Sequence, residues 1–354
     1  MLRIGNKDVG DGAPCYVIAE AGSNHDGSLD QARSLVKIAS KAGADAVKFQ
    51  TFKASTMYPR RSGTVDYLER LGVSASIYDI VESLEMPYEW IKELAGLCEE
   101  QGLHFLSTPF DEASVDALEP FVQAFKIASY ELTHIPLIRY AARRGKPMIL
   151  STGAGTMEEI GDAAEAVRAE GNDQICLTQC TAKYPAPLDS INVAVIPALK
   201  EAFGVAVGLS DHSEHPTIAP SAAVAVGANI IEKHFTLSKR LPGPDHSYAL
   251  EPDELATMVE TIRLTERATG SALKGPQPVE AELSNYRRSI YTRRPLEKGH
   301  RLTTDDLIVL RRPGHPGTGL EPMHLSLVLG RELTRDVPEQ EILGPDDMEP
   351  RVDV

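Results

Sequence analysis

Charged and hydroxyl side chains recur at the ends of short apolar runs in the first two-thirds of the sequence. Glu20, Lys48, Lys126, Ser210 and His234 are the clearest examples. Lysines and hydroxyls bind phosphates and carboxylates, whereas a carboxylate or an imidazole can ligate a metal ion or move a proton. This set of residue types predicts an enzyme that acts on a small anionic substrate.

Two histidines are candidate metal ligands. His212 shares a strand face with Ser210, and His234 shares one with Glu232, because alternate side chains of a strand point the same way. If both faces point into a closed barrel, the two imidazoles converge at its mouth. Two histidine ligands leave the other positions to water and substrate oxygens, which favours Mn2+, Fe2+, Co2+ or Zn2+ over Mg2+. Either histidine taken alone could instead be a hydrogen-bonded structural residue.

Lysines and hydroxyls at other run ends predict a cradle for an oxyanion. Burial of an ammonium group is costly without an anion nearby, so inward lysines favour this interpretation. Schiff-base chemistry by Lys48 or Lys126, as in a barrel aldolase, is the alternative for the lysines. Helix capping is the alternative for the hydroxyls. The candidate cradle residues are Lys48, Thr108, Lys126, Ser129, Ser151, Thr152 and Gly153.

Eight apolar runs alternate with helix-length segments, which predicts a (β/α)8 barrel. In that fold the carboxyl ends of the strands form the active site, and the polar residues above stand at those ends. The segment Leu29–Ala44 has the apolar spacing of a helix that covers such a barrel. The predicted strands are Val17–Ala21, Ala46–Gln50, Phe105–Pro109, Phe125–Ser129, Met148–Thr152, Ile175–Cys180, Ala206–Asp211 and Ile230–Phe235.

The 354 residues exceed the length of a barrel alone, so we expect a second, smaller module. We predict a barrel domain over residues 1–270, a linker over 271–285 and a terminal domain over 286–354. The segment Phe52–Pro87 is far longer than an ordinary connection in such a barrel, and we expect it to cover the mouth.

Composition excludes several partners. The net charge of −15 argues against binding to nucleic acid or to an anionic membrane surface. No apolar run approaches the length of a membrane span, and the first residues do not resemble a signal peptide. The four cysteines show no zinc-type pairing, and we expect them to be reduced thiols in a cytoplasmic protein.

Nine sequence blocks, in order, resemble the sialic acid synthase family. That family includes the N-acetylneuraminate, legionaminate and pseudaminate synthases and related spore-coat polysaccharide proteins. A single block would be weak evidence, but nine in register are highly specific. The blocks are residues 20–27 (EAGSNHDG), 48–51 (KFQT), 107–110 (STPF), 126–129 (KIAS), 151–153 (STG), 179–185 (QCTAKYP), 208–212 (GLSDH), 232–236 (EKHFT) and 243–246 (GPDH).

The resemblance continues into the terminal domain. Residues 287–289, 295–299, 302–307 and 311–314 are similar to the antifreeze-like (SAF) domain that ends these synthases. The segment Leu302–Leu307 (LTTDDL) also recurs as Leu343–Met348 (LGPDDM), forty-one positions later. This repeat suggests a β-rich module of two similar arms. Chance similarity of six residues is the alternative.

The resemblance implies condensation of phosphoenolpyruvate with an N-acylmannosamine-type sugar. The product would be a nine-carbon 2-keto acid, and phosphate would leave with cleavage of its C–O bond. His212 and His234 would hold a divalent metal, with Mn2+ favoured and Mg2+, Co2+, Fe2+ or Zn2+ as alternatives. The phosphoenolpyruvate cradle would be Lys48, Thr108, Lys126, Ser129, Ser151 and Ser210.

The resemblance also implies roles for residues around the sugar. Glu20 would organise the sugar aldehyde and water and move a proton. Gln50, Tyr184 and Asp245 would meet the sugar hydroxyls. Arg312 matches an arginine that reaches from one subunit into the barrel of the other, so a domain-swapped homodimer would follow.

Two departures from the family pattern bear on specificity. Ala182 stands where N-acetylneuraminate synthases have a polar residue, often Asn, and Thr181 or Lys183 could replace that contact. The segment 74–78 (SASIY) lacks the Asn that some members place there. Two alternative functions are another phosphoenolpyruvate-dependent 3-deoxy-ulosonate synthase and a non-catalytic carbohydrate-binding homologue.

Overall fold

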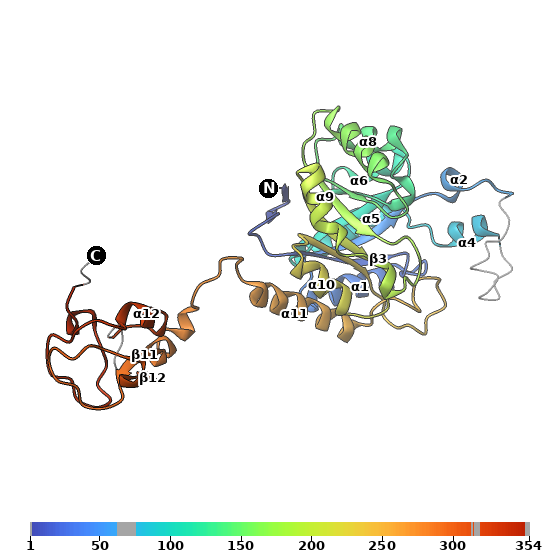
Figure 1. The fold of residues 1–354 in the computed structure, drawn as a ribbon. Helices are drawn as coiled ribbons and strands as arrows, with labels where there is room; N and C mark the ends of the chain where they lie inside the picture. The colour runs from blue at the N-terminus through green and yellow to red at the C-terminus, as the bar shows by residue number, and fades with distance from the viewer. Residues whose placement is uncertain (1, 62–75, 313, 315–318, 351–354) are drawn as a thin grey trace. The chain divides into compact units, whose positions relative to one another are not determined.

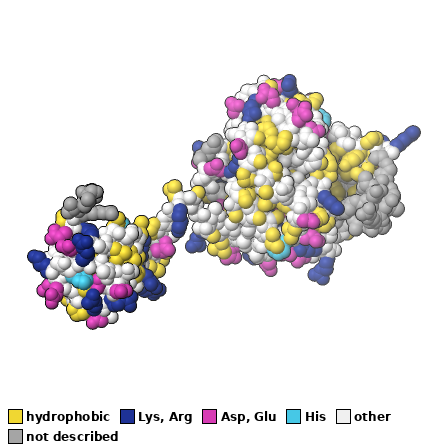
Figure 2. Space-filling view, in the orientation of Figure 1, with side chains coloured by type: hydrophobic (Ala, Val, Ile, Leu, Met, Phe, Trp, Pro, Cys, Tyr) yellow, Lys and Arg dark blue, Asp and Glu magenta, His cyan; other side chains and the backbone are white. Residues whose placement is uncertain are grey.

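The structure is a computed structural model that describes residues 2–61, 76–312, 314 and 319–350 (Figure 1). The chain divides into two compact units, Met1–Gly270 and Ser271–Val354. Among the described residues, no helix is both long and apolar enough to cross a bilayer. On the face drawn in Figure 2, acidic and basic side chains are interspersed over both units.

The first unit is a closed barrel of eight parallel strands, as the sequence predicts. Each strand pairs with the next along the chain, and the last pairs with the first. His234 lies opposite Glu20 where the barrel closes. The strands are β3 (Tyr16–Gly22), β4 (Ala46–Thr51), β5 (His104–Pro109), β6 (Phe125–Ile127), β7 (Met148–Ser151), β8 (Ile175–Cys180), β9 (Ala206–Asp211) and β10 (Ile230–His234).

Helices surround the barrel and bury their apolar faces against it (Figure 1). Local sequence explains where they begin: Ser28 accepts a hydrogen bond from the Gln31 backbone N–H at the start of α1, and Thr156 and Glu159 form a capping box at α8. The helices that follow the strands are α1 (Leu29–Lys41), α5 (Glu89–Glu100), α6 (Glu112–Leu118), α7 (Ile135–Ala142), α8 (Met157–Arg168), α9 (Val195–Phe203), α10 (Ile218–Ala225) and α11 (Pro252–Thr269).

A short hairpin closes the amino-terminal end of the barrel, a feature that the sequence pattern did not predict. Its strands are β1 (Leu2–Ile4) and β2 (Lys7–Val9). Leu2, Ile4 and Val9 are buried in a cluster with the first inward residues of the barrel strands, among them Ile18 and Ile230. Each strand of the hairpin is too short to give a periodic signal.

The barrel interior changes from apolar to charged along the strands. On β3 and β4, Ile18 and Ala46 lie in the apolar cluster at the amino-terminal end, while Glu20 and Lys48, two residues further on, bind each other. Alternation of side chains carries the same inward face from the hydrophobic layer to the polar one. The strands therefore deliver charged groups only to the carboxyl end.

Strands β6, β7 and β10 each end before their predicted bounds, β6 by the most. β6 ends at Ile127, and Ser129 begins a 3-10 turn, Ser129–Glu131. The Ser129 hydroxyl accepts a hydrogen bond from the Gly153 backbone N–H at 3.0 Å. Helix α9 begins at Val195 because the chain before it includes Asn192, whose φ of 51° is incompatible with a right-handed helix.

The long connection between β4 and α5 contains two short helices, α2 (Ala54–Met57) and α4 (Ile77–Ser83). Phe52 packs edge-on against Phe110 of the next strand's loop. Lys53 forms an ion pair with Glu85 at 2.7 Å, which joins the two ends of the segment. Residues 62–75 lie outside the described residues, so the expectation that this segment covers the mouth stays a prediction.

The second unit contains two arms related by the forty-one-residue repeat. β11 (Arg288–Thr292) pairs antiparallel with β12 (Leu307–Arg311), and one short helix, α12 (Leu325–Val328), follows. Leu296 bridges Val337, its counterpart in the other arm. The ion pairs repeat as well: Arg294–Asp306 and Arg335–Asp347 are both 2.6 Å long. The sequence repeat therefore corresponds to a repeat of structure.

Candidate active site

Lys48 lies at the centre of the charged layer at the carboxyl end of the barrel. Its Nζ is 2.8 Å from Glu20 Oε2 and donates to Thr108 Oγ1 at 3.0 Å. The Gln50 amide donates to the other Glu20 oxygen at 3.0 Å. Glu20, Lys48 and Thr108 are buried, and Gln50 is half-buried. Four of the predicted site residues are therefore in contact through side chains of three adjacent strands.

Glu232 joins the second lysine to this group. Its Oε1 lies 3.4 Å from Lys126 Nζ and 3.9 Å from Lys48 Nζ, and it accepts from the Ser210 hydroxyl at 3.1 Å. Glu232 shares the inward strand face with His234, as strand parity predicts, but no role was predicted for it from the sequence. The available signal was its parity, because a carboxylate among inward lysines is expected to pair with them.

Burial and neighbouring charges oppose each other at the two carboxylates. Burial raises the pKa of Glu20 to about 7, even though Lys48 favours its charged form. Burial also acts on Glu232, but Lys126 and Lys48 outweigh it and lower the pKa of that carboxyl. Burial likewise opposes the charge of Lys48, but Glu20 and Glu232 prevail and raise its pKa. The site therefore holds two lysines and the carboxylate of Glu232, which stays charged at neutral pH. It also holds the carboxyl of Glu20, which can exchange a proton near neutral pH.

Hydroxyl and backbone N–H groups form the neighbouring wall. Ser129 donates to the Ser151 hydroxyl at 3.1 Å, and the backbone N–H of Gly153 donates to Ser129. A Cβ on Gly153 would lie 2.7 Å from Ser129 Oγ and 3.0 Å from Ala182 Cβ, so this position needs glycine. The hydroxyl of Thr181 donates to the Ser190 carbonyl at 2.6 Å, so Thr181 is already engaged away from Ala182.

The two histidines meet at the mouth, as the strand parity predicts. Their ring centroids are 5.7 Å apart, and both side chains are buried. His212 Nδ1 lies 2.9 Å from the Thr181 carbonyl, which requires a proton on Nδ1 and leaves Nε2 as the basic nitrogen of the neutral ring. His234 Nδ1 is buried without a hydrogen-bond partner in the structure.

These two rings fit a metal site with two protein ligands. Burial lowers the pKa of His234 well below its usual value, which favours the neutral, ligating form of that ring. Burial also opposes the charged form of His212, but hydrogen bonds with Cys180 and with the Thr181 carbonyl outweigh it and raise the pKa of His212. Among the described residues, no group of three or more His, Cys, Asp or Glu side chains could hold a metal ion. The remaining coordination positions would therefore belong to water or substrate oxygens.

Aromatic and acidic side chains line the histidines on the outer side. The Tyr184 ring lies 4.1 Å from the His212 ring, centroid to centroid, and 5.5 Å from the ring of Tyr248. Asp245 Oδ2 is 3.9 Å from His234 Nδ1, and burial raises the pKa of Asp245. The predicted sugar-binding residues Tyr184 and Asp245 are thus next to the predicted metal ligands.

A buried ion pair on the outer face of the barrel links the two strands that carry the histidines. Lys233 Nζ is 2.6 Å from Asp211 Oδ2, and Asp211 also accepts from the Ser213 backbone N–H at 2.9 Å. Asp211 therefore faces away from the candidate active site. Arg312 lies in the second unit, directly after β12, and its side chain is buried.

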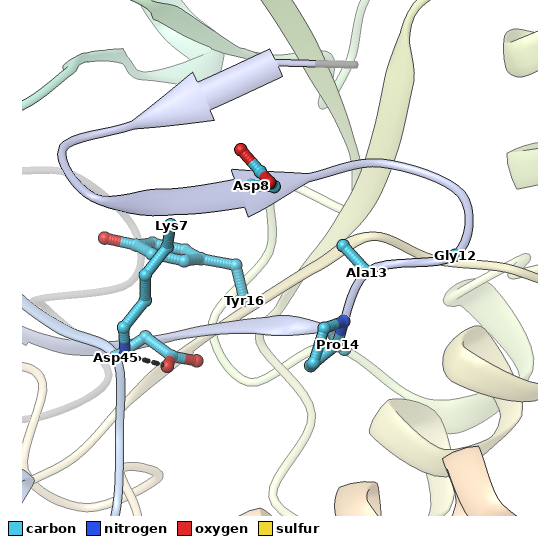
Figure 3. Close-up of a pocket in the computed structure, with 8 residues that line it drawn as sticks. Lys7, Asp8, Gly12, Ala13, Pro14, Tyr16 and Asp45 are labelled. Carbon is cyan, nitrogen blue, oxygen red and sulfur yellow. Dashed lines mark hydrogen bonds and ion pairs between the residues drawn. The ribbon is translucent and has the colours of Figure 1, made fainter.

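The pocket in Figure 3 is at the other end of the barrel. It has a volume of about 520 Å3 and is lined by the hairpin, the loop after it and the residues that begin β3 and β4. Its charged groups bind one another, since Lys7 pairs with Asp45, which also pairs with Arg263 at 3.0 Å. The catalytic candidates all lie at the carboxyl ends of the strands, so this pocket is separate from the active site.

Comparison with known proteins identifies the family. The model of the NeuB family matches residues 35–274, and the model of the SAF domain matches residues 287–349. The chain is 48% identical to the spore coat polysaccharide biosynthesis protein SpsE of Bacillus subtilis, over 95% of this chain and 94% of that protein. It is 39% identical to the N,N'-diacetyllegionaminic acid synthase of Legionella pneumophila, over 94% of each chain.

A solved structure supports the same assignment. The crystal structure of the N-acetylneuraminic acid (sialic acid) synthetase of Leptospira borgpetersenii, in complex with citrate, is 30% identical and has a TM-score of 0.72. The match covers 80% of this chain and 94% of that chain. The barrel domain and the SAF domain therefore both have counterparts among known proteins.

Proposed function

The chain belongs to the sialic acid synthase family, and from this we propose that it condenses phosphoenolpyruvate with an N-acylmannosamine-type sugar or a related aldose. The product is a nine-carbon 2-keto acid of the sialic acid class, and phosphate is released. The observation that carries the proposal is the buried group of Lys48, Lys126, Glu20 and Glu232 beside two histidines at the barrel mouth. The relatives named as synthases and as spore coat polysaccharide proteins support a role in polysaccharide biosynthesis.

Phosphoenolpyruvate binds through the lysines and the hydroxyl wall. Lys48 and Lys126 supply positive charge for its phosphate and carboxylate, and Thr108 and Ser210 already contact the same charged group. The second anionic group is bound by the hydroxyls of Ser129 and Ser151. Backbone N–H groups of residues 129–131 and 151–153 add further donors. Ala182 adds no polar side chain to this wall.

His212 and His234 would hold a divalent metal ion, and imidazole ligands favour Mn2+, Fe2+, Co2+ or Zn2+ over Mg2+. The family resemblance favours Mn2+ among these. When bound, the ion supplies Lewis-acid polarisation of the sugar aldehyde. The Thr181 carbonyl fixes the tautomer of His212, and burial keeps His234 neutral. Tyr184 and Asp245 hold the sugar beside these rings, and Gln50 contacts it from β4.

Glu20 moves the proton in the reaction. C3 of the enol forms a bond to the aldehyde carbon, whose oxygen takes a proton, and water adds at C2. The C2–O bond is then cleaved, phosphate leaves with that oxygen, and the hydroxyl from water becomes the ketone of the keto acid as it gives up its proton. A carboxyl with a pKa of about 7 populates both protonation states near neutral pH, so Glu20 can give one proton and accept another.

The terminal SAF domain completes the site from a second subunit. Arg312 follows β12 in the second unit, at the position of the family's arginine that enters the partner's barrel. A domain-swapped homodimer is therefore part of the proposal. The Arg312 guanidinium would contact the sugar of the partner's site as a planar hydrogen-bond donor.

Lysine chemistry of the aldolase type is disfavoured. Glu20 and Glu232 raise the pKa of Lys48, which keeps it as an ammonium group rather than a nucleophilic amine. The electrostatic role of Lys48 is thus better supported than a Schiff base. Another 3-deoxy-ulosonate synthase would need a site for a sugar phosphate, and the acceptor assay below distinguishes the two.

Three substitutions test the site. Glu20→Gln, Lys126→Ala and His234→Ala should each reduce phosphate release at least a hundredfold, since each removes a group that acts on the reacting atoms. Circular dichroism and size-exclusion chromatography check that each variant is folded. His134→Ala, which removes a helix cap on α7, is the control and should retain wild-type turnover. Wild-type rates in all three site variants would refute the assignment.

A further inference from the structure

A hydrogen-bonded chain outside the charged group joins two loops at the barrel mouth. Asp26 follows β3, Thr236 follows β10, and His246 lies in the loop that returns to β10 at Leu250. His246 Nε2 is 2.9 Å and 3.0 Å from the two Asp26 carboxylate oxygens, and its Nδ1 is 2.6 Å from Thr236 Oγ1. Because a carboxylate only accepts, Nε2 donates to Asp26. We refer to Asp26, His246 and Thr236 as the loop clamp.

The loop clamp is a built feature of the fold. The His246 side chain is fully buried. A further hydrogen bond fixes Asp26, since the Gln31 amide donates to Asp26 Oδ2 at 2.6 Å. Asp26 itself has a φ of 48°, a left-handed conformation that Asp adopts more readily than most residues. Gly243 packs directly over the pair: a Cβ there would lie 2.7 Å from His246 Cδ2 and 2.8 Å from Asp26 Oδ1.

The residues on either side of His246 face the candidate sugar site. Asp245 is 3.9 Å from His234, and the Tyr248 ring lies 5.5 Å from the His234 ring. His246 is therefore the anchor of a short segment whose neighbours reach the mouth, while its own ring points to Asp26 and touches none of the charged group.

We propose that the loop clamp is a positioning device that holds Asp245 and Tyr248 for the acceptor sugar, and so sets the affinity for the sugar without affecting that for phosphoenolpyruvate. This inference rests on the proposed function for the identity of the ligand. The separation follows from the geometry, because the clamp joins the β3 and β10 loops, whereas Lys48, Lys126 and the hydroxyl wall lie on strands β4 to β7 or directly after them. Of the predicted cradle, Ser210 alone lies beside β10, on β9.

Steady-state kinetics with both substrates varied tests the proposal in the full-length protein. Asp26→Ala and His246→Asn should raise KM for the sugar by roughly tenfold or more, the effect of losing a charge-assisted hydrogen bond, and change KM for phosphoenolpyruvate less than about twofold. His246→Gln keeps a donor at the Nε2 position and should recover part of the loss. Gly243→Ala separates Asp26 from His246 without removing either polar group, and it should also raise KM for the sugar.

His104→Ala is the matched control. His104 also makes two hydrogen bonds, to Tyr16 at 2.7 Å and to Asn6 at 2.9 Å, but at the amino-terminal end of the barrel. It should lower the melting temperature and leave both KM values unchanged. Equal increases of both KM values in the clamp variants, or wild-type values in all of them, would overturn the proposal.

A second measurement separates this proposal from the proposed function. Hydrogen–deuterium exchange of residues 237–249 should become faster in Asp26→Ala and His246→Asn, while exchange in α11 stays as in the wild type. If the wild type releases no phosphate with any sugar, the proposed function fails, and faster exchange still supports the clamp as the anchor of this loop. Unchanged exchange would refute the clamp whatever the activity.

Discussion

At the residue scale, the site balances two lysines against two carboxylates inside a barrel. The sequence identified Glu20, Lys48 and Lys126 because each lies at the end of an apolar run. The alternation of side chains along a strand also shows which residues share its inward face. It did not identify the role of Glu232, since only the fold brings that carboxylate within 3.4 Å of Lys126 and 3.9 Å of Lys48. Contacts between non-adjacent strands depend on barrel closure, which sequence periodicity does not encode.

Removal of Glu232 should expose this balance. Glu232→Gln leaves two buried ammonium groups with one carboxyl between them, and we expect the free energy of unfolding to fall by roughly 3–5 kcal/mol. Saturating phosphoenolpyruvate should restore more of the melting temperature in the variant than in the wild type, because an anion replaces the lost charge. Thermal unfolding with and without phosphoenolpyruvate measures both effects. An unchanged melting temperature of the free variant would contradict the electrostatic account.

The pKa of Glu20 predicts proton uptake when phosphoenolpyruvate binds. The pKa is about 7 in the free enzyme, and a neighbouring anion raises it further, because negative charge favours the neutral carboxylic acid. Slightly above neutral pH, binding should therefore take up a fraction of a proton that Glu20→Gln does not take up. Calorimetric titration in buffers with different ionisation enthalpies gives the proton count. Equal counts in the two proteins would show that Glu20 does not titrate in this range.

At the scale of elements, the strands and helices of the barrel follow from periodicity, and the departures have local causes. β6 stops at Ile127 because Ser129 turns away to bind Gly153 and Ser151, a tertiary contact that the sequence pattern does not reveal. The β1–β2 hairpin was missed because three-residue strands have no measurable period. In the second unit, the repeat of Leu302–Leu307 in Leu343–Met348 did predict the two related arms.

Asp306 is the strongest local test of the second unit. Its carboxylate is buried, but hydrogen bonds from His300, Thr303 and Arg294 outweigh burial and hold its pKa well below the usual value. A depressed pKa contributes stability that is fully present above the unfolded value of 3.8 and is lost as pH falls below it.

Asp306→Asn should therefore lower the stability of the second unit by about 1–3 kcal/mol at neutral pH. The difference from the wild type should shrink as the pH falls below about 4. Hydrogen–deuterium exchange of β11 and β12, followed against pH, reports on this unit separately from the barrel. A stability difference that grows on acidification would have the wrong sign and would contradict the account.

At the scale of the whole molecule, the two units carry different parts of the proposed site. The barrel holds the charged group and the histidines, and the second unit carries Arg312. Sequence resemblance predicted that Arg312 acts on the partner's barrel, and this remains a prediction, because it concerns a contact between subunits.

Mixed dimers test the shared site. Glu20→Gln and Arg312→Ala should each be inactive alone, but a mixed dimer would contain one barrel with an intact Glu20 and an intact Arg312 from its partner. Random mixing of equal amounts forms hybrids as half of the dimers, so about one quarter of wild-type activity should return. Unfolding and refolding the two proteins together allows the exchange. No recovery from folded, mixed dimers would place Arg312 in its own subunit's site, and full activity of Arg312→Ala alone would place it outside any site.

The central claim is tested most directly by phosphate release from phosphoenolpyruvate in the presence of Mn2+. The acceptors are N-acetylmannosamine, mannose and the 2,4-diacetamido-2,4,6-trideoxy sugars, each run with a chelator control and with a sugar phosphate for comparison. The account predicts release that requires both a non-phosphorylated sugar and the metal, and the active sugar identifies the substrate class. Absence of release with every sugar from folded, dimeric protein, or release only with a sugar phosphate, would contradict it.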